Sequence, residues 1–381
     1  MKKTTKLFCI FLILIFTLSF LICTTFWVSS STTAYAQTSA KSMCVIESNS
    51  SRVLYEKNKA QKLPMASTTK IMTAITAIEN CPNLDEKFEI SPKAVGISGT
   101  SLYLKKGERL SVRDLLYGLM LISGNDSSVA IGERVGGTVQ KFVDMMNNTA
   151  QKIGAFNTHF DNTHGLDSKT HYTTAYDLAL ITSYALENPI FKEIVSTPNI
   201  KITSQEGKTR YLKNKNKLLT SLDGCVGVKT GFTNDAGRCL VSACERDGMT
   251  LVCVVLNCGP MFEESRSLLE QGFNEFKLVD LTDGYNYPTE IDVVDGRKDS
   301  VKVSTKENHV YYPLKANEKD RVNYVYDIKN TLEAPIEKGT EVGSVKISID
   351  NDLHFEEKIY TIEHVRRNSV WEKFKDLVTE W

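Results

Sequence analysis

The sequence predicts an α/β (α+β) domain followed by a C-terminal all-β domain and a terminal amphipathic helix. Its 381 residues, 24% charged and 41% hydrophobic, are enough for two folded domains. Apolar strands alternate with segments of helical periodicity over residues 37–276. Short alternating segments separated by turn residues fill residues 277–363, a pattern typical of a small β domain. The terminal helix is expected within residues 364–381.

The first 36 residues have the features of an export signal. Three lysines precede an apolar stretch from Leu7 to about Val28, and Ala34-Tyr35-Ala36 has the small-x-small form of a cleavage site. We therefore expect residues 1–36 to be a signal peptide. The apolar stretch is also long enough to span a bilayer, so an uncleaved anchor is the alternative. Both interpretations place the remaining chain outside the cytoplasm.

Charge and cysteine content argue against two classes of ligand. Lys+Arg and Asp+Glu both number 46, so no basic excess is available to neutralise a nucleic-acid backbone. The cysteines that follow residue 36 are odd in number and dispersed, a poor disulfide framework. Cys239 and Cys244, like Cys253 and Cys258, lie five residues apart in predicted strands, which places each pair on opposite faces. We expect buried free thiols and no metal or cofactor.

The first domain is predicted to contain two β-hairpins and several helices. Ile71, Ile75 and Ile78 recur at helical spacing and predict a mostly buried helix. Ser123-Gly124-Asn125 interrupts a longer helical segment, and Asp247-Gly248 is a hairpin turn signal. The predicted strands are residues 42–48, 52–56, 238–245 and 249–257, and the predicted helices are residues 65–79, 111–135 in two parts, 139–153, 174–186 and 265–276.

The second domain is predicted from five short strands, at residues 290–294, 301–304, 310–314, 322–328 and 345–349. The tail that follows places its large apolar side chains on one helical stripe, opposite charged residues. One interpretation is a helix packed on its own domain. We expect instead that this helix lies in a membrane surface, because it is amphipathic, contains two tryptophans and belongs to an exported protein. Its apolar residues are Trp371, Phe374, Leu377, Val378 and Trp381.

Ser67-Thr68-Thr69-Lys70 is the only Ser-x-x-Lys in the chain and the first candidate for catalysis. On a helix, residues i and i+3 share a face, so the Lys70 amine can reach the Ser67 hydroxyl. An amine held in a partly apolar site can lose its proton and act as a base toward the serine. Taken alone the motif is weak, because a helix N-cap serine followed by an exposed lysine gives the same sequence pattern.

Two further motifs strengthen this candidate. Ser123-Gly124-Asn125 follows it, and Lys229-Thr230-Gly231 comes just before the apolar hairpin, on a predicted edge strand. Gly231 would let a substrate backbone approach that strand, and Lys229 and Thr230 would offer a charge and a hydroxyl to a carboxylate. The ordered set Ser-x-x-Lys, Ser-x-Asn and Lys-Thr-Gly is the known signature of penicillin-binding proteins and serine β-lactamases, here with Gly124 in place of Asp.

On these motifs the sequence resembles the low-molecular-weight penicillin-binding proteins, bacterial D-alanyl-D-alanine carboxypeptidases that trim peptidoglycan stem peptides. The resemblance is close over about residues 40–276 and looser through the β domain and the tail helix. It implies a catalytic domain like that of serine β-lactamases and penicillin-binding proteins, inhibition by β-lactams, and a position at the outer face of the cytoplasmic membrane or secretion. Further matching segments are Pro64-Met65-Ala66, Asn162-Thr163-His164-Gly165-Leu166-Asp167, His171-Tyr172-Thr173-Thr174-Ala175 and Lys229-Thr230-Gly231-Phe232-Thr233.

The resemblance also implies roles for individual residues. Ser67 would attack the carbonyl of the penultimate D-alanine, and Lys70 would take its proton. Ser123 would relay a proton to the leaving amine, while Asn125 positions Lys70 and the substrate. The substrate-binding residues would be Lys229, Thr230, Gly231 and Phe232, with the terminal carboxylate on Lys229 and Thr230 and the oxyanion on the backbone N–H groups of Ser67 and Phe232.

Other functions and residues compete with this interpretation. A serine β-lactamase of class A needs a Glu-x-x-Leu-Asn segment, which this sequence lacks. Peptidoglycan endopeptidase or transpeptidase activity would use the same acyl-enzyme, and a silent peptidoglycan-binding scaffold is the non-enzymatic alternative. His164 and His171 are expected in loop or cap roles and Asp126 in local hydrogen bonds, while Arg238 is a candidate second cation for the carboxylate.

Overall fold

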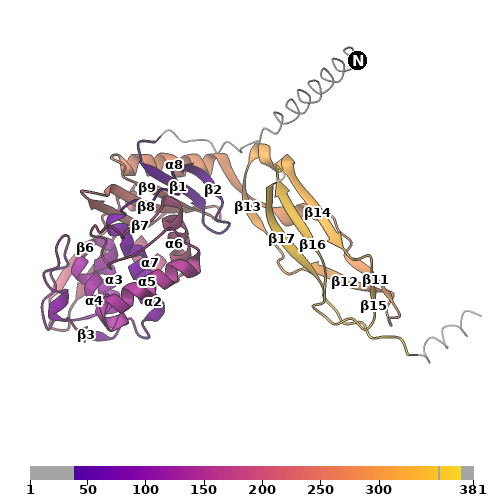
Figure 1. Ribbon diagram of the computed structural model, residues 1–381, viewed down its shortest axis with the longest axis horizontal. Helices are drawn as coiled ribbons and strands as arrows, with labels where there is room; N and C mark the ends of the chain where they lie inside the picture. The colour runs from indigo at the N-terminus through magenta and orange to yellow at the C-terminus, as the bar shows by residue number, and fades with distance from the viewer. Residues whose placement is uncertain (1–37, 351, 370–381) are drawn as a thin grey trace, which may run out of the picture. The chain divides into compact units, whose positions relative to one another are not determined.

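The computed structural model describes residues 38–350 and 352–369, and its first part is built on a five-stranded antiparallel sheet (Figure 1). The strand order is β2-β1-β9-β8-β7, which places β7 at an edge. Both predicted hairpins are confirmed, and the one joining β8 to β9 turns at Asp247-Gly248. The strands are β1 (Ser42–Glu47), β2 (Val53–Lys57), β7 (Cys225–Thr233), β8 (Gly237–Arg246) and β9 (Met249–Leu256).

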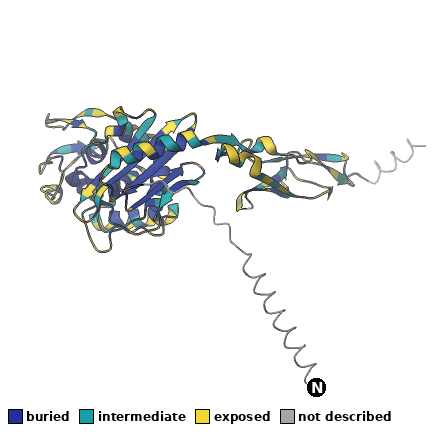
Figure 2. Cartoon of the chain, turned by 90° about the horizontal axis from the view of Figure 1, so that it is seen from above, coloured by how far each residue is buried: buried dark blue, intermediate teal, exposed yellow. Residues whose placement is uncertain are grey.

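Helices cover the two faces of this sheet, as Figure 1 shows, and Figure 2 shows the buried strands between them. Helix α8 packs on one face, where Met43 and Val45 of β1 point. Cys44 and Ile46 point to the other face, against the remaining helices, because strand side chains alternate. The helices are α2 (Lys70–Asn80), α3 (Val112–Leu121), α4 (Asn125–Gly136), α5 (Val139–Ile153), α6 (Ala175–Glu187), α7 (Pro189–Ser196) and α8 (Met261–Glu275).

Most of the predicted helices are confirmed, with shifts at their ends. The break at Ser123-Gly124 separates α3 from α4, although Asn125 is already helical. Helix α8 begins at Met261, four residues before the predicted start at Ser265. Helix α7 and two short hairpins were not predicted. These are β3 (Lys87–Glu89) with β4 (Arg109–Ser111), and β5 (Asn199–Thr203) with β6 (Thr209–Lys213).

The cysteine prediction is correct for one pair and wrong for the other. Cys239 packs among the helices on one face of the sheet and Cys244 in the α8 cluster on the other. Cys253 and Cys258 both pack in the α8 cluster. The reason is that β9 ends at Leu256 and the chain turns at Asn257, which has a φ of 51°, so strand alternation stops before Cys258.

The second domain contains a six-stranded sheet with the order β14-β16-β17-β12-β11-β15 and a separate pair, β10 with β13. Two small apolar clusters form its core. All five predicted strands are present, while β10, β15 and β17 were not predicted. The strands are β10 (Phe276–Asp280), β11 (Glu290–Val294), β12 (Ser300–Thr305), β13 (Tyr311–Lys315), β14 (Val322–Ile328), β15 (Thr331–Glu333), β16 (Glu341–Ile349) and β17 (Asp352–Thr361).

Two predictions concern the ends of the chain. Residues 364–369 are not helical, because Val365 and Arg367 form β-bridges to Ile336 and Gly296. The apolar residues of the predicted tail helix, from Trp371 onward, and the predicted signal peptide lie outside the described residues. Among residues 38–350 and 352–369, no helix is both long and apolar enough to cross a bilayer.

Candidate active site

Ser67 lies on a short 3₁₀ turn, η1 (Ala66–Thr69), that leads directly into α2. The sequence predicts it within the first turn of an α-helix, so the tighter turn is a small correction. Side-chain hydrogen bonds hold this turn: Thr68 donates to the Met65 carbonyl over 2.6 Å and Thr69 to the Ala66 carbonyl over 2.9 Å. Both threonines are buried, while Ser67 is partly exposed and lines a pocket. The nucleophile candidate is therefore presented on a rigid turn.

Lys70 is fully buried and directs its amine at three acceptors. Its Nζ lies 2.9 Å from Ser67 Oγ, 2.7 Å from Asn125 Oδ1 and 2.6 Å from the His164 carbonyl oxygen. Burial lowers the pKa of Lys70 well below its usual range, and the charges of Lys229 and Lys215 lower it further. A neutral amine would keep its two hydrogens on Asn125 and His164 and accept the Ser67 proton. This arrangement supplies a base for a serine nucleophile.

Ser123 and Asn125 reach the site from the break between α3 and α4. Asn125 is the first residue of α4; its backbone N–H donates to the Thr100 carbonyl over 2.7 Å and its Nδ2 to the Ser98 carbonyl over 2.6 Å. These bonds fix the amide so that Oδ1 faces Lys70. Ser123 has a φ of 69° and lines the same pocket as Ser67. A non-glycine residue in this conformation marks a strained connection, a feature common at functional sites.

Asp126 shapes the loop beside this pocket. Its carboxylate accepts hydrogen bonds from the backbone N–H of Leu102 over 2.8 Å, the N–H of Leu104 over 3.0 Å and the Ser101 hydroxyl over 2.6 Å. The predicted local hydrogen bonding is limited to the Ser127 N–H, which donates to this carboxylate over 2.9 Å, while the other partners lie more than 20 residues away in the sequence. The loop that it holds includes Thr100, which lines the pocket and accepts from Asn125.

The Lys-Thr-Gly segment lies on β7 at the sheet edge, as predicted. Lys229 is buried and donates to the Thr230 carbonyl over 2.9 Å, and burial together with the nearby charge of Lys215 lowers its pKa to about 7. A Cβ on Gly231 would lie 3.1 Å from the Ser67 nitrogen, so glycine lets β7 approach the nucleophile turn itself. Thr230, Gly231, Phe232 and Arg238 line the pocket together with Ser67 and Ser123.

Sequence reasoning missed three contributors to this site. The His164 carbonyl is a backbone acceptor for Lys70, and no side-chain pattern signals it. Lys215, an exposed residue shortly after β6, lines the pocket and lowers the pKa of both buried lysines. Gly165 has a φ of 91°, and a Cβ there would lie 1.8 Å from the Ala66 carbonyl oxygen. The segment containing His164 and Gly165 resembled the family, but only the structure gives it a role.

We expect Gly165→Ala to disrupt the nucleophile turn. A methyl group would displace the Ala66 carbonyl, and the left-handed φ adds strain, so unfolding free energy should fall by about 2–5 kcal/mol. Penicillin acylation should fall with it. The matched control is Gly154→Ala, which has a φ of 89° but open space around its Cβ and should lose only about 1–2 kcal/mol. Equal losses in both variants, measured by denaturant unfolding, would contradict the steric argument.

The two histidines of interest have structural contacts. Burial lowers the pKa of each to about 4, so both are neutral near pH 7. His171 accepts the Asp161 N–H at Nδ1 over 3.0 Å, so its Nε2 carries the proton and donates to Thr69 Oγ1 over 2.8 Å. His164 Nδ1 accepts the Leu166 N–H over 3.1 Å. These contacts fit the expected loop roles, and His171 also supports the turn that carries Ser67.

A serine hydrogen-bonded to a buried lysine, in a pocket edged by a Lys-Thr-Gly strand, is the arrangement of a serine acyl-transfer enzyme. Residues 29–259 match the family described as D-alanyl-D-alanine carboxypeptidase. Residues 273–367 match the C-terminal domain of penicillin-binding protein 5. The chain therefore belongs to the D-alanyl-D-alanine carboxypeptidase family, among the low-molecular-weight penicillin-binding proteins.

Individual relatives agree with this assignment. The D-alanyl-D-alanine carboxypeptidase DacF of Bacillus subtilis is 28% identical over 349 residues, 90% of each chain. Penicillin-binding protein 5 from Haemophilus influenzae superposes with a TM-score of 0.73 at 27% identity, covering 87% of this chain and 99% of that one. A Streptomyces DD-transpeptidase, solved as a mutant, superposes with a TM-score of 0.60 at 32% identity, covering 63% of this chain and 99% of that one.

Proposed function

We propose that this serine-type D-alanyl-D-alanine carboxypeptidase removes the terminal D-alanine from peptidoglycan stem peptides through an acyl-enzyme on Ser67. The observation that carries the proposal is the contact of 2.9 Å between Lys70 Nζ and Ser67 Oγ, with the amine buried and its pKa depressed. Lys70 takes the hydroxyl proton as Ser67 Oγ attacks the penultimate carbonyl carbon. The oxyanion forms beside the backbone N–H groups of Ser67 and Phe232.

Collapse of this intermediate breaks the peptide bond. Ser123 lies in the same pocket and passes a proton to the departing D-alanine amine, while Asn125 holds the Lys70 amine in place. Water then hydrolyses the ester between Ser67 and the peptide, with Lys70 again as the base. A penicillin would acylate Ser67 by the same attack, but its leaving group stays tethered and the ester persists.

The direct test uses the purified protein and an acylated peptide ending in D-Ala-D-Ala. We expect release of free D-alanine, together with a stable adduct when a fluorescent penicillin is added. Mass mapping should place the penicilloyl group on the peptide that contains Ser67. Rapid penicillin hydrolysis without D-alanine release would instead support a serine β-lactamase. Absence of both activities and of labelling would support a silent scaffold.

A second candidate activity shares the acyl-enzyme. The similar Streptomyces protein is a DD-transpeptidase, an activity in which an amine replaces water as the acceptor. Endopeptidase cleavage of cross-linked peptides differs in the leaving group. Adding a D-amino acid or a short peptide amine to the assay would reveal transfer as a new product.

We expect Lys229 and Thr230 to bind the terminal carboxylate. Replacing Lys229 by Ala, or Thr230 by Val, should lower kcat/KM roughly 10- to 150-fold on a peptide with a free carboxylate, the equivalent of about 1.5–3 kcal/mol. The loss should be smaller on the corresponding C-terminal amide, because no carboxylate is present. Lys213→Ala, at an exposed position of β6, is the control and should leave both substrates unaffected. Equal losses on both substrates would indicate a purely structural role.

We also propose that the enzyme acts on the outer side of the cytoplasmic membrane and attaches to it through its tail, in keeping with a cell-wall-acting family. Burying each large apolar side chain of the tail in the headgroup region contributes about 1.5–3 kcal/mol, which suffices for peripheral attachment. Truncation after Ser369 should therefore release the signal-processed protein from liposomes without changing D-alanine release. If sedimentation finds the truncated protein still bound, the tail is not the anchor.

A further inference from the structure

Cys225 and Cys244 are directly opposite each other on the strands β7 and β8. Opposite residues of an antiparallel pair have Cα atoms about 4.5 or 5.5 Å apart. Disulfides require Cα atoms about 4.4–6.8 Å apart, so this pair satisfies the backbone requirement. The pair lies at the open end of the hairpin formed by β7 and β8, and Cys225 is on the strand that carries Lys229 and Thr230.

A β-bulge brings the two thiols to one face of the sheet. The register shifts between Cys225 and Gly227, so that Cys225 pairs with Cys244 while Gly227 pairs with Ala243. Without the extra residue, Cys244 would face Val226. Cys225 and Cys244 accordingly both pack in the α8 cluster, whereas Val226 and Ala243 pack on the opposite face.

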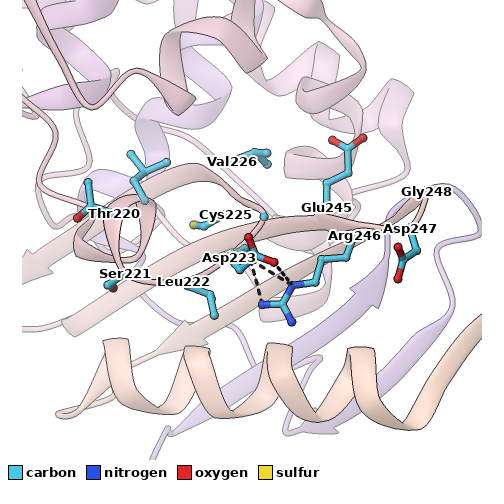
Figure 3. Close-up of a pocket in the computed structure, with 12 residues that line it drawn as sticks. Thr220, Ser221, Leu222, Asp223, Cys225, Val226, Glu245, Arg246, Asp247 and Gly248 are labelled. Atoms are coloured by element: carbon cyan, nitrogen blue, oxygen red, sulfur yellow. Dashed lines mark hydrogen bonds and ion pairs between the residues drawn. The ribbon is translucent and has the colours of Figure 1, made fainter.

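The two thiols differ in exposure. Cys225 is partly exposed and lines an open pocket, where Figure 3 shows it beside Asp223 and Arg246. Cys244 is fully buried. The neighbouring Cys244 thiol lowers the pKa of Cys225 against the opposing effect of burial, and the charge of Arg266 acts in the same direction as Cys244. Cys225 is thus the accessible and more readily ionised member of the pair.

We propose that Cys225 and Cys244 form a reversible redox pair that small-molecule disulfides convert into a cross-strand disulfide. The Cys225 thiolate attacks the oxidant, forming a mixed disulfide and releasing one thiolate. Cys244 then loses its proton and attacks the Cys225 sulfur, which expels the second thiolate. Two protein thiols are oxidised and one external disulfide is reduced, and the two protons that Cys225 and Cys244 lose are taken up by the two expelled thiolates, which leave as thiols. The disulfide product links the start of β7 covalently to β8.

The test treats the reduced, folded protein with oxidised glutathione, followed by alkylation and peptide mapping. Wild type should lose two titratable thiols and yield one peptide linked between Cys225 and Cys244. Cys244→Ala should instead accumulate glutathione on Cys225, because the resolving thiol is missing. Cys225→Ser should form neither product. Cys81→Ser removes a partly exposed thiol remote from the pair and is the matched control, so it should behave as wild type.

Two outcomes would overturn the proposal. The first is wild-type protein that carries only glutathione adducts, on Cys225 or Cys81, with no intramolecular link. The second is a linked protein whose melting temperature does not rise above that of the reduced form, because a disulfide closing this hairpin without distortion should raise it by several degrees. The Cys225→Ser variant supplies the baseline, since oxidation should leave its melting temperature unchanged.

Discussion

Ser67→Ala is expected to abolish penicillin labelling and to lower D-alanine release by about 10⁴-fold or more. The variant keeps the turn, the buried Lys70 and the pocket, but it has no atom that can form the ester. Residual turnover would come only from substrate binding and the oxyanion donors. Gel fluorescence with a labelled penicillin and a D-alanine assay measure the two losses separately.

The control must distinguish lost chemistry from lost folding. Ser67 is partly exposed and its hydroxyl contacts Lys70, so alanine should leave thermal unfolding nearly unchanged. Ser221→Ala, which removes an exposed serine that does not line the pocket with Ser67, should label as wild type. Labelling of Ser67→Ala at another serine, such as Ser123, would mean that the nucleophile is misassigned.

The contact between Ser67 and Lys70 could be predicted because it depends on one local element. Residues three apart on any helical turn share a side, and this holds for the 3₁₀ turn as well as for an α-helix. Asn125 meets Lys70 across 55 residues of sequence, so only the family resemblance brought it into the site. The His164 carbonyl could not be predicted, because every residue has a backbone oxygen and the side-chain sequence does not indicate which of them accepts a hydrogen bond from Lys70.

The prediction of the strands has a similar limit, because strands that depend on tertiary pairing are missed. Strands β8 and β9 were predicted because each contains a continuous run of mostly apolar residues, which is typical of a strand that is buried on both faces. Strand β17 was not predicted; its centre carries Glu356, Glu357 and Lys358, and these residue types are uncommon in strands. It forms because β16 pairs along nearly its whole length and β12 pairs on its other side. Pairing of this kind is a tertiary effect that propensity along one segment does not record.

Lys70→Ala should lower the second-order rate of penicillin acylation by about 10²–10⁴-fold, because the serine loses its base. Lys70→Arg should lose about as much. Arginine keeps the positive charge and the donors toward Asn125 and His164, but it does not give up its proton near neutral pH. An Arg variant with near wild-type acylation would show that Lys70 positions Ser67 rather than deprotonating it.

The pH profile supplies an independent test of the same role. Only neutral Lys70 accepts a proton, so the acylation rate should fall as pH drops through its depressed pKa. Lys215 lines the pocket, and its positive charge helps to lower that pKa. Lys215→Gln should therefore raise the pKa of Lys70 and move the acidic limb to higher pH.

The free energy of unfolding should also depend on the titration of Lys70. Below the folded-state pKa of Lys70 both states are protonated and burial of the charge opposes folding. Between that pKa and the ordinary value of 10.5, the unfolded chain binds more protons, so unfolding free energy rises with pH. Lys70→Ala should lose this contribution to the slope. An acidic limb that Lys215→Gln leaves in place, together with an unchanged stability slope in Lys70→Ala, would mean that the group titrating in catalysis is not Lys70.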